Sequence, residues 1–299
     1  MAGSQATADA PLCAPPDPNP LKPRTSLPAG ACDCHAHICG PASVYRYSPS
    51  RIYTPPDAVL PDYLNMLAAI GADRAVIIQP SVYGTDNTVT LEAVAAADIP
   101  CRGVAVVDED ISDQEIERLD RAGIRGIRLN LVDVADPKGG IPLAGARRLA
   151  QRIAPLDWHV ELLVHVDDCP DFDAMFDDFP SDIVLGHMGY MRPGTGIGAA
   201  GFQALLRLME NGRCWVKLTG PYRISAGDLP YGDILAAAQA LVETAPDRVI
   251  WGTDWPHVMV TKPMPNDGAL CDLLGDWIAD RANLEKVLVD NPANLYGFD

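Results

Sequence analysis

Residues 32–37 read Cys-Asp-Cys-His-Ala-His, a run with the length of one β-strand in which polar side chains occupy every second position. Successive side chains point to opposite faces of a strand, so we expect Asp33, His35 and His37 on one face and the smaller residues on the other. Two imidazoles and a carboxylate on one face do not suit a packed apolar core. We therefore expect this face to point into a site.

Seven more runs along the chain have the length and composition of short strands, and helical patterns with apolar residues three or four positions apart lie between them. The expected strands are residues 32–37, 74–79, 102–107, 126–130, 159–165, 183–187, 214–219 and 248–254. The expected helices are residues 60–70, 88–97, 112–122, 144–154, 202–210, 234–244 and 270–278.

Strict alternation of strand and helix predicts parallel pairing, and eight strands are the number that a closed barrel needs. An open doubly wound sheet shares this pattern, but no Gly-x-Gly-x-x-Gly run follows the first strand to favour it. The sequence therefore predicts an α/β protein with a (β/α)8 TIM-type barrel as a single domain over residues 31–299. Residues 1–30 contain seven prolines and are expected to form an extended N-terminal arm.

The net charge of −17 argues against nucleic acid and anionic membranes as partners, because both are bound through basic residues. The chain has no basic start followed by an apolar run and no apolar stretch of the ~20 residues that span a bilayer. The eight cysteines show no Cys-x-x-Cys spacing, which argues against a disulfide scaffold or a zinc ribbon. We expect a cytoplasmic protein.

Two more histidines and a carboxylate close expected strands: His165, His187 and Asp254. The carboxyl ends of barrel strands carry the active sites of barrel enzymes. A single histidine at a strand end is most often a hydrogen-bonded structural residue. Four of the six histidines at one end, beside a carboxylate, instead favour a divalent cation that satisfies all of them at once.

The remaining two histidines carry less information. His159 opens its strand at the opposite end of the barrel and is expected to be structural, and His257 is expected at the rim or behind the ligands. Imidazole and carboxylate donors suit zinc, while manganese and iron remain alternatives on ligand type alone.

Several runs occur in an order that resembles the amidohydrolase superfamily over nearly the whole chain after residue 30. They are 33–37 (Asp-Cys-His-Ala-His), His165, 187–189 (His-Met-Gly) and 252–257 (Gly-Thr-Asp-Trp-Pro-His). Within the superfamily, 81–87 (Ser-Val-Tyr-Gly-Thr-Asp-Asn), 125–130 (Arg-Gly-Ile-Arg-Leu-Asn) and 249–256 are most similar to lactonases that open pyrone dicarboxylates or sulfomuconolactones. The resemblance implies a hydrolase acting on the carboxylic ester bond of a lactone formed in aromatic-compound catabolism.

Two differences among these relatives bear on the metal. The pyrone-dicarboxylate lactonases work without a metal and lack a histidine at the end of the fifth strand, where this chain has His165. His165 therefore favours a metal site, as in the sulfomuconolactone hydrolases. Members with two metals commonly use a carboxylated lysine on the fourth strand, where this chain has Arg128, so one ion is expected.

The predicted site is one Zn²⁺, with Mn²⁺ as the alternative, held by His35, His37, His165, His187 and Asp254. The ion would lower the pKa of a water molecule towards ~7. Asp254 would take a proton from the attacking water and return one to the departing oxygen, and His187, as ligand or catalytic group, would stabilise the oxyanion.

The substrate is expected to be a small anionic lactone similar to 4-sulfomuconolactone. Arg128, with Asn130 beside it, and Arg223 could hold its anionic arms, because guanidinium fits carboxylate and sulfonate oxygens. Salt bridges to the many carboxylates are an equally good interpretation of either arginine. Lys217 also faces inward, where it could contact substrate or pair with Asp33 or Glu161.

Tyr53 and Ser81 match positions near the substrate in the resembling lactonases. Two other enzyme classes remain open: a metal-independent 2-pyrone-4,6-dicarboxylate lactonase, and a metal-dependent decarboxylase of an unsaturated or aromatic acid on the same barrel. A protein that binds a metal or sugar acid without catalysis is a third alternative, in which Asp254 would have no evident task. Pairing of barrels into a homo-oligomer through exposed helices has no motif that supports it.

Overall fold

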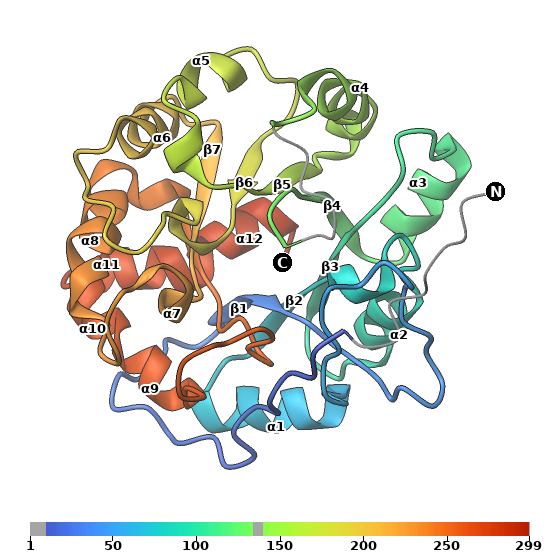
Figure 1. Ribbon diagram of the computed structural model, residues 1–299, viewed down its shortest axis with the longest axis horizontal. Helices are drawn as coiled ribbons and strands as arrows, with labels where there is room; N and C mark the ends of the chain where they lie inside the picture. Colours follow the sequence, from blue (N-terminus) through green and yellow to red (C-terminus); the bar gives the residue numbers. More distant parts are fainter. Residues whose placement is uncertain (1–9, 134–139, 299) are drawn as a thin grey trace.

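The computed structural model describes residues 10–133 and 140–298 of the chain. Eight parallel strands surround its centre, each hydrogen-bonded to the next in chain order, and helices enclose them (Figure 1). The strands are β1 (Cys32–Ala36), β2 (Arg74–Ile78), β3 (Cys101–Ala105), β4 (Ile124–Asn130), β5 (His159–Leu163), β6 (Ile183–Leu185), β7 (Cys214–Leu218) and β8 (Val249–Trp251). Contacts between β1 and β8 close the ring. The predicted (β/α)8 barrel is confirmed.

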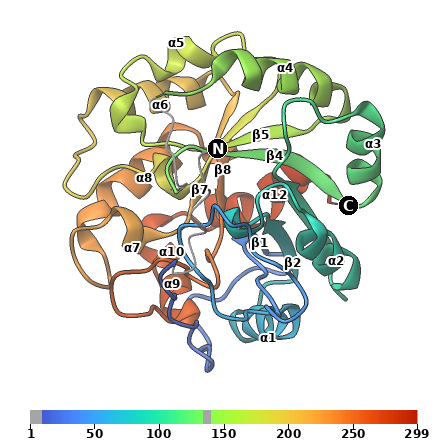
Figure 2. The ribbon, with the colours of Figure 1, turned by 45° about the vertical axis from the view of Figure 1, so that its right-hand side comes forward.

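Helices follow the strands in the predicted alternation and form the outer layer, as a second view shows (Figure 2). They are α1 (Leu60–Ile70), α2 (Thr88–Ala96), α3 (Asp113–Arg121), α4 (Leu143–Ile153), α5 (Phe172–Phe176), α6 (Ala200–Glu210), α7 (Pro221–Ile224), α8 (Leu235–Thr244), α9 (Asp267–Asp272), α10 (Leu274–Trp277), α11 (Arg281–Glu285) and α12 (Asn291–Tyr296). The single helix predicted at 270–278 is instead two short helices, α9 and α10, which meet at Leu273.

Local signals explain why the best-predicted helices begin and end where they do. Helix α1 has Pro61 in its first turn and ends at Gly71, whose φ of 83° is left-handed. Helix α3 begins after Ser112, whose side chain accepts a hydrogen bond from the backbone of Glu115 at 3.1 Å. Both helices lie within one residue of their predicted bounds.

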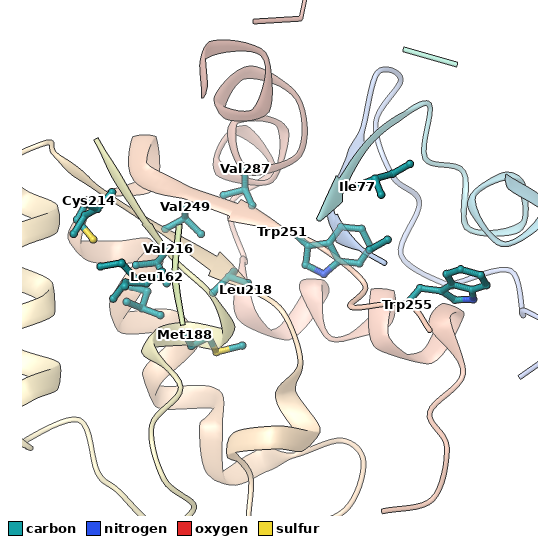
Figure 3. Packing of buried hydrophobic residues seen from close by; sticks show 14 of the residues in the cluster. Ile77, Leu162, Met188, Cys214, Val216, Leu218, Val249, Trp251, Trp255 and Val287 are labelled. Atoms are coloured by element: carbon teal, nitrogen blue, oxygen red, sulfur yellow. The ribbon is translucent and has the colours of Figure 1, made fainter. Parts of the chain in front are cut away.

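Apolar side chains fill two layers. One layer lies between the strands and the outer helices, where Leu162, Val216, Leu218 and Val249 project from neighbouring strands (Figure 3). The other lies inside the barrel and is closed at one end by Tyr296 and two neighbours at the end of the chain. The interior layer comprises Cys32, Cys34, Val76, Ile78, Val104, Val184, Trp215, Ile250, Leu295, Tyr296 and Phe298.

The expected alternation along the first strand is wrong. Cys32 and Cys34 pack in the barrel interior, whereas Asp33 accepts a hydrogen bond from Tyr63 of α1 at 3.0 Å. The pairing of β1 with β2 slips by one residue between Asp33 and Ala36, so β1 contains one extra residue. This bulge brings the following side chains round to the mouth of the barrel, and the two histidines reach the site although Asp33 does not.

Residues 10–30 run along the outside of the barrel. The backbone of Cys13 bonds to that of Thr54 at 2.9 Å, and the Leu21 backbone donates to Asn266 at 3.0 Å. Arg24 is anchored to Asp272 on α9, although its own side chain is exposed. The first nine residues of the predicted arm lie outside the described residues. All eight cysteines are free, and in the described ranges no helix has the length and apolar character to cross a bilayer.

Close contact between helix α6 and the loop after β5 gives a test of the fold. A Cβ atom at Gly201 would lie 1.8 Å from the carbonyl oxygen of Val166, so backbone must move to admit it. We expect Gly201→Ala to lower the free energy of unfolding by at least about 2 kcal/mol in denaturant titrations. Gly198→Ala, where a Cβ meets nothing within 4 Å, should change it by less than about 0.5 kcal/mol. Equal effects would contradict the packing described.

Candidate active site

Closure of the barrel brings the first strand and the segment after the last strand together at its mouth. The backbone N–H of Asp254 donates to the carbonyl of His35 at 2.8 Å, and the N–H of His37 donates to the carbonyl of Trp255 at 2.7 Å. Asp254 lies three residues past the end of β8 with a φ of 67°, which turns its side chain towards β1. As a result its Oδ1 atom lies 3.6 Å from His35 Nε2 and 3.9 Å from His37 Nε2.

These three side chains could hold a metal ion. Among the described residues, His35, His37 and Asp254 are the one group of three or more such side chains whose ligand atoms lie within 4.8 Å of one another. Buried His35 Nε2 and Asp254 Oδ1 have no hydrogen-bond partner in the described part of the chain. The Nδ1 atom of His37 lies 2.8 Å from the carbonyl of Ile78, which places its proton there and leaves Nε2 free to ligate.

Protonation also suits ligation. Burial lowers the pKa of His35, and lowers that of His37 to about 3, so both imidazoles are neutral at cellular pH. Burial alone would raise the pKa of Asp254, but the nearby Arg223 guanidinium, the histidines and a hydrogen bond from Tyr222 hold it well below its usual range. The site thus presents neutral imidazoles and an ionised carboxylate, which are the forms that bind cations.

Lys217 does not line the site, contrary to one of its predicted roles. Its Nζ atom lies beneath the mouth, 2.7 Å from Glu161 Oε2 and 2.8 Å from the carbonyl of Cys34, and the side chain is fully buried. Of the two ion pairs predicted for it, the one with Glu161 is confirmed and the one with Asp33 is wrong. Nζ also approaches His35 Nδ1 at 3.3 Å, so Lys217 supports a site residue from below.

Asp254 is held from behind by two neighbours on α7. Its Oδ2 atom accepts from Tyr222 Oη and from Arg223 Nε, each at 2.6 Å. Tyr222 Oη also lies 3.0 Å from Nδ1 of His257, whose Nε2 lies 3.1 Å from Asp267 Oδ1. This buried chain of contacts confirms His257 as a residue behind the site. It orients the Asp254 carboxylate and leaves Oδ1 facing the histidines.

His165 and His187 do not join the metal group. His165 lies two residues past the end of β5, where its Nδ1 contacts the carbonyl of Tyr190 at 2.6 Å and its ring packs on the Tyr190 ring. His165 is therefore outside the group of converging ligand atoms, but its Nδ1 contact leaves Nε2 available, so its role as a ligand stays a prediction. His187, with a φ of 50°, reaches the mouth, and its ring centroid lies 5.2 Å from that of His35.

A narrow cavity opens above these groups. Five of the six predicted substrate-binding residues line it: Tyr53, Ser81, Arg128, Asn130 and Arg223. The rest of its wall consists of His37, Asp133, His187, Asp254, Val258 and Met259. The cavity therefore joins the carboxylate and imidazoles to both predicted guanidinium groups.

The sequence reasoning missed Tyr222 and Asp133 as members of the site. Tyr222 directly precedes Arg223, so its place after the seventh strand was an available signal. Asp133 comes three residues after Asn130, in the loop that follows the strand. The alternation of side chains along a strand does not apply to a loop, so it could not indicate where Asp133 points. Asn130 Oδ1 accepts from the Asp133 backbone at 2.9 Å, which folds the loop back over the cavity.

Comparisons with known proteins cover almost the whole chain. A family model described as amidohydrolase matches residues 32–298. The chain is 37% identical over 292 residues to a 2-pyrone-4,6-dicarboxylate hydrolase of Comamonas testosteroni, with 93% of each chain covered. It is 35% identical over 297 residues to a 4-sulfomuconolactone hydrolase of Hydrogenophaga intermedia, covering 98% of this chain and 97% of the relative. An apo crystal structure from Agrobacterium tumefaciens gives a TM-score of 0.84 at 29% identity, covering 93% of this chain and 99% of that one.

The buried ion pair gives a test of the role of Lys217. Replacing Lys217 by Met leaves Glu161 charged without its closest partner, so we expect Lys217→Met to lower the free energy of unfolding by about 3–5 kcal/mol. The double variant Lys217→Met/Glu161→Leu should recover a large part of that loss in the same chemical denaturation experiment. A Lys217→Met variant as stable as the wild type would refute the structural role.

Proposed function

The chain belongs to the amidohydrolase family, and we propose that it is a hydrolase that opens the ester bond of a small anionic lactone. Two curated relatives, 35% and 37% identical over most of the chain, are named as hydrolases of such lactones. The observation that carries the proposal is the cavity in which Asp254 and two imidazoles face Arg128 and Arg223. Proton-transfer groups and anion-binding groups are thereby within reach of one small molecule.

The residues can be assigned roles in lactone hydrolysis. Asp254 is the proton acceptor for the attacking water, because it is ionised and its Oδ1 has no hydrogen-bond partner among the described residues. His187 borders the cavity, so its imidazole can donate a hydrogen bond to the developing oxyanion. Water adds to the carbonyl carbon, the ring C–O bond breaks, and Asp254 returns the proton to the departing oxygen.

Arg128 is the seat proposed for the anionic arm of the substrate. Its side chain is almost fully buried, lines the cavity, and has an Nε atom without a hydrogen-bond partner in the described residues. Arg223 donates a hydrogen bond to Asp254 and so orients the catalytic carboxylate, and it also lies next to the substrate. Tyr53, Ser81 and Asn130 complete the polar wall.

Metal dependence is part of the proposal. His35, His37 and Asp254 would hold one divalent cation, zinc or manganese by ligand type. Such an ion supplies a water molecule of lowered pKa and an electrophile for the carbonyl oxygen. His165 lies outside the converging ligand group, so a metal-independent lactonase is the second candidate.

Metal content separates the two candidates without reference to turnover. After reconstitution with zinc, we expect elemental analysis to find one ion per chain, because three ligand atoms already converge. His37→Ala should lose that ion. His159→Ala should retain it, because His159 lies at the opposite end of the barrel against Tyr296. Wild-type protein without stoichiometric metal would establish the metal-independent alternative.

Hydrolysis itself is tested by base uptake during turnover of a lactone such as 4-sulfomuconolactone. We expect one equivalent of base per lactone opened, and Asp254→Asn should lower kcat at least about a hundredfold because it removes the proton acceptor. Asp157→Asn removes a carboxylate at an exposed turn before β5, at the other end of the barrel, and should retain wild-type activity. Release of CO2 instead of acid would reassign the chain to the decarboxylases.

A further inference from the structure

The cavity carries opposite charges on its side chains. Arg128 and Arg223 are its cations, and Asp133 and Asp254 are its anions among the described residues of the wall. The two guanidinium groups are therefore matched by two carboxylates, although a relative named for a dicarboxylate substrate suggests a basic pocket.

Of the two guanidinium groups that line the described cavity, that of Arg128 makes the weaker contacts with the protein. Arg223 donates to Asp254 Oδ2 at 2.6 Å and to the carbonyl of Val258 at 2.9 Å. Arg128 donates from Nη1 to the carbonyl of Gln79 at a longer 3.3 Å. Its Nε is 3.6 Å from Glu161 Oε1, and that carboxylate already pairs with Lys217 at 2.7 Å. A carboxylate or sulfonate of the substrate is therefore expected to bind at Arg128.

The cavity wall also contains a carboxylate, which disfavours binding of a second anionic group of the substrate. Asp133 lines the cavity, its backbone is held by Asn130, and Tyr190 Oη lies 3.5 Å from Asp133 Oδ1. A carboxylate repels another anion but accepts a hydrogen bond from a hydroxyl group, and the oxygen of the Tyr190 phenol, whose O–H donates to Asp133, can accept one as well. Asp133 and Tyr190 thus form a corner suited to hydroxyl groups.

We propose that Asp133 makes this site selective for lactones with a single anionic arm, seated on Arg128, and a neutral hydroxylated or unsubstituted edge facing Asp133 and Tyr190. The inference rests on the proposed lactone hydrolysis and narrows its substrate class. Selectivity of this kind comes from repulsion of the wrong ligand as much as from attraction of the right one.

The test compares two lactones that differ by one charge. Muconolactone carries one carboxylate, and 4-sulfomuconolactone carries the same carboxylate plus a sulfonate. We expect the wild type to have the higher kcat/KM for muconolactone. Asp133→Asn, which preserves shape and removes the charge, should shift the ratio of the two kcat/KM values about tenfold towards the sulfonated compound, chiefly through its KM.

Asp157→Asn is the matched control, since it makes the same charge change outside the cavity and should leave the ratio as in the wild type. The selectivity proposal fails if both lactones are hydrolysed and Asp133→Asn leaves their ratio unchanged. It also fails if the wild type prefers the sulfonated compound. If neither lactone is opened by the wild type or by any variant, the proposed hydrolytic function fails instead, so the two failures are distinguishable.

Discussion

The hydrogen bonds that join β1 to the segment after β8 are the constraint on which the site depends. One runs from the Asp254 backbone to His35, and the other from the His37 backbone to Trp255. Because they close the sheet at its mouth, they set two imidazoles from the first strand against a carboxylate from the last. Asp33 supports the same seam, since its carboxylate accepts bonds from the backbone and hydroxyl of the residue before Asp254.

Buried charge around this seam is balanced by pairing. A lone charge inside the barrel would be costly, and Glu161 accordingly binds Lys217 below the mouth while Arg223 binds Asp254 at the mouth. Each pair has a structural consequence: the lower one supports the floor beneath His35, and the upper one orients the catalytic carboxylate. An arginine or lysine that pairs with a carboxylate of the protein is less available to bind an anionic substrate. Because the net charge is −17, few basic side chains remain for that role.

The predicted strands were correct in number and order, but seven of the eight were too long at their carboxyl ends. Strand β8 ends at Trp251, whereas it was expected to continue to Asp254. Strand β6 ends at Leu185, whereas it was expected to continue to His187. Asp254 and His187 have left-handed backbones, with φ of 67° and 50°. A period-two pattern assumes extended backbone, so it names these residues as strand ends but cannot say where their side chains point.

By itself, the sequence determined the barrel, its family, and the residue types that supply the site. Local periodicity and ordered motifs carry that information, and His35, His37, Asp254 and Arg128 were all identified from them. Only the tertiary structure decided which of these groups meet. It left His165 outside the converging ligand group, and it brought an unpredicted carboxylate to the cavity wall. The physical reason is that contacts between loops depend on bulges, left-handed turns and hydrogen bonds across the barrel, which join residues far apart in the chain and leave no periodic trace.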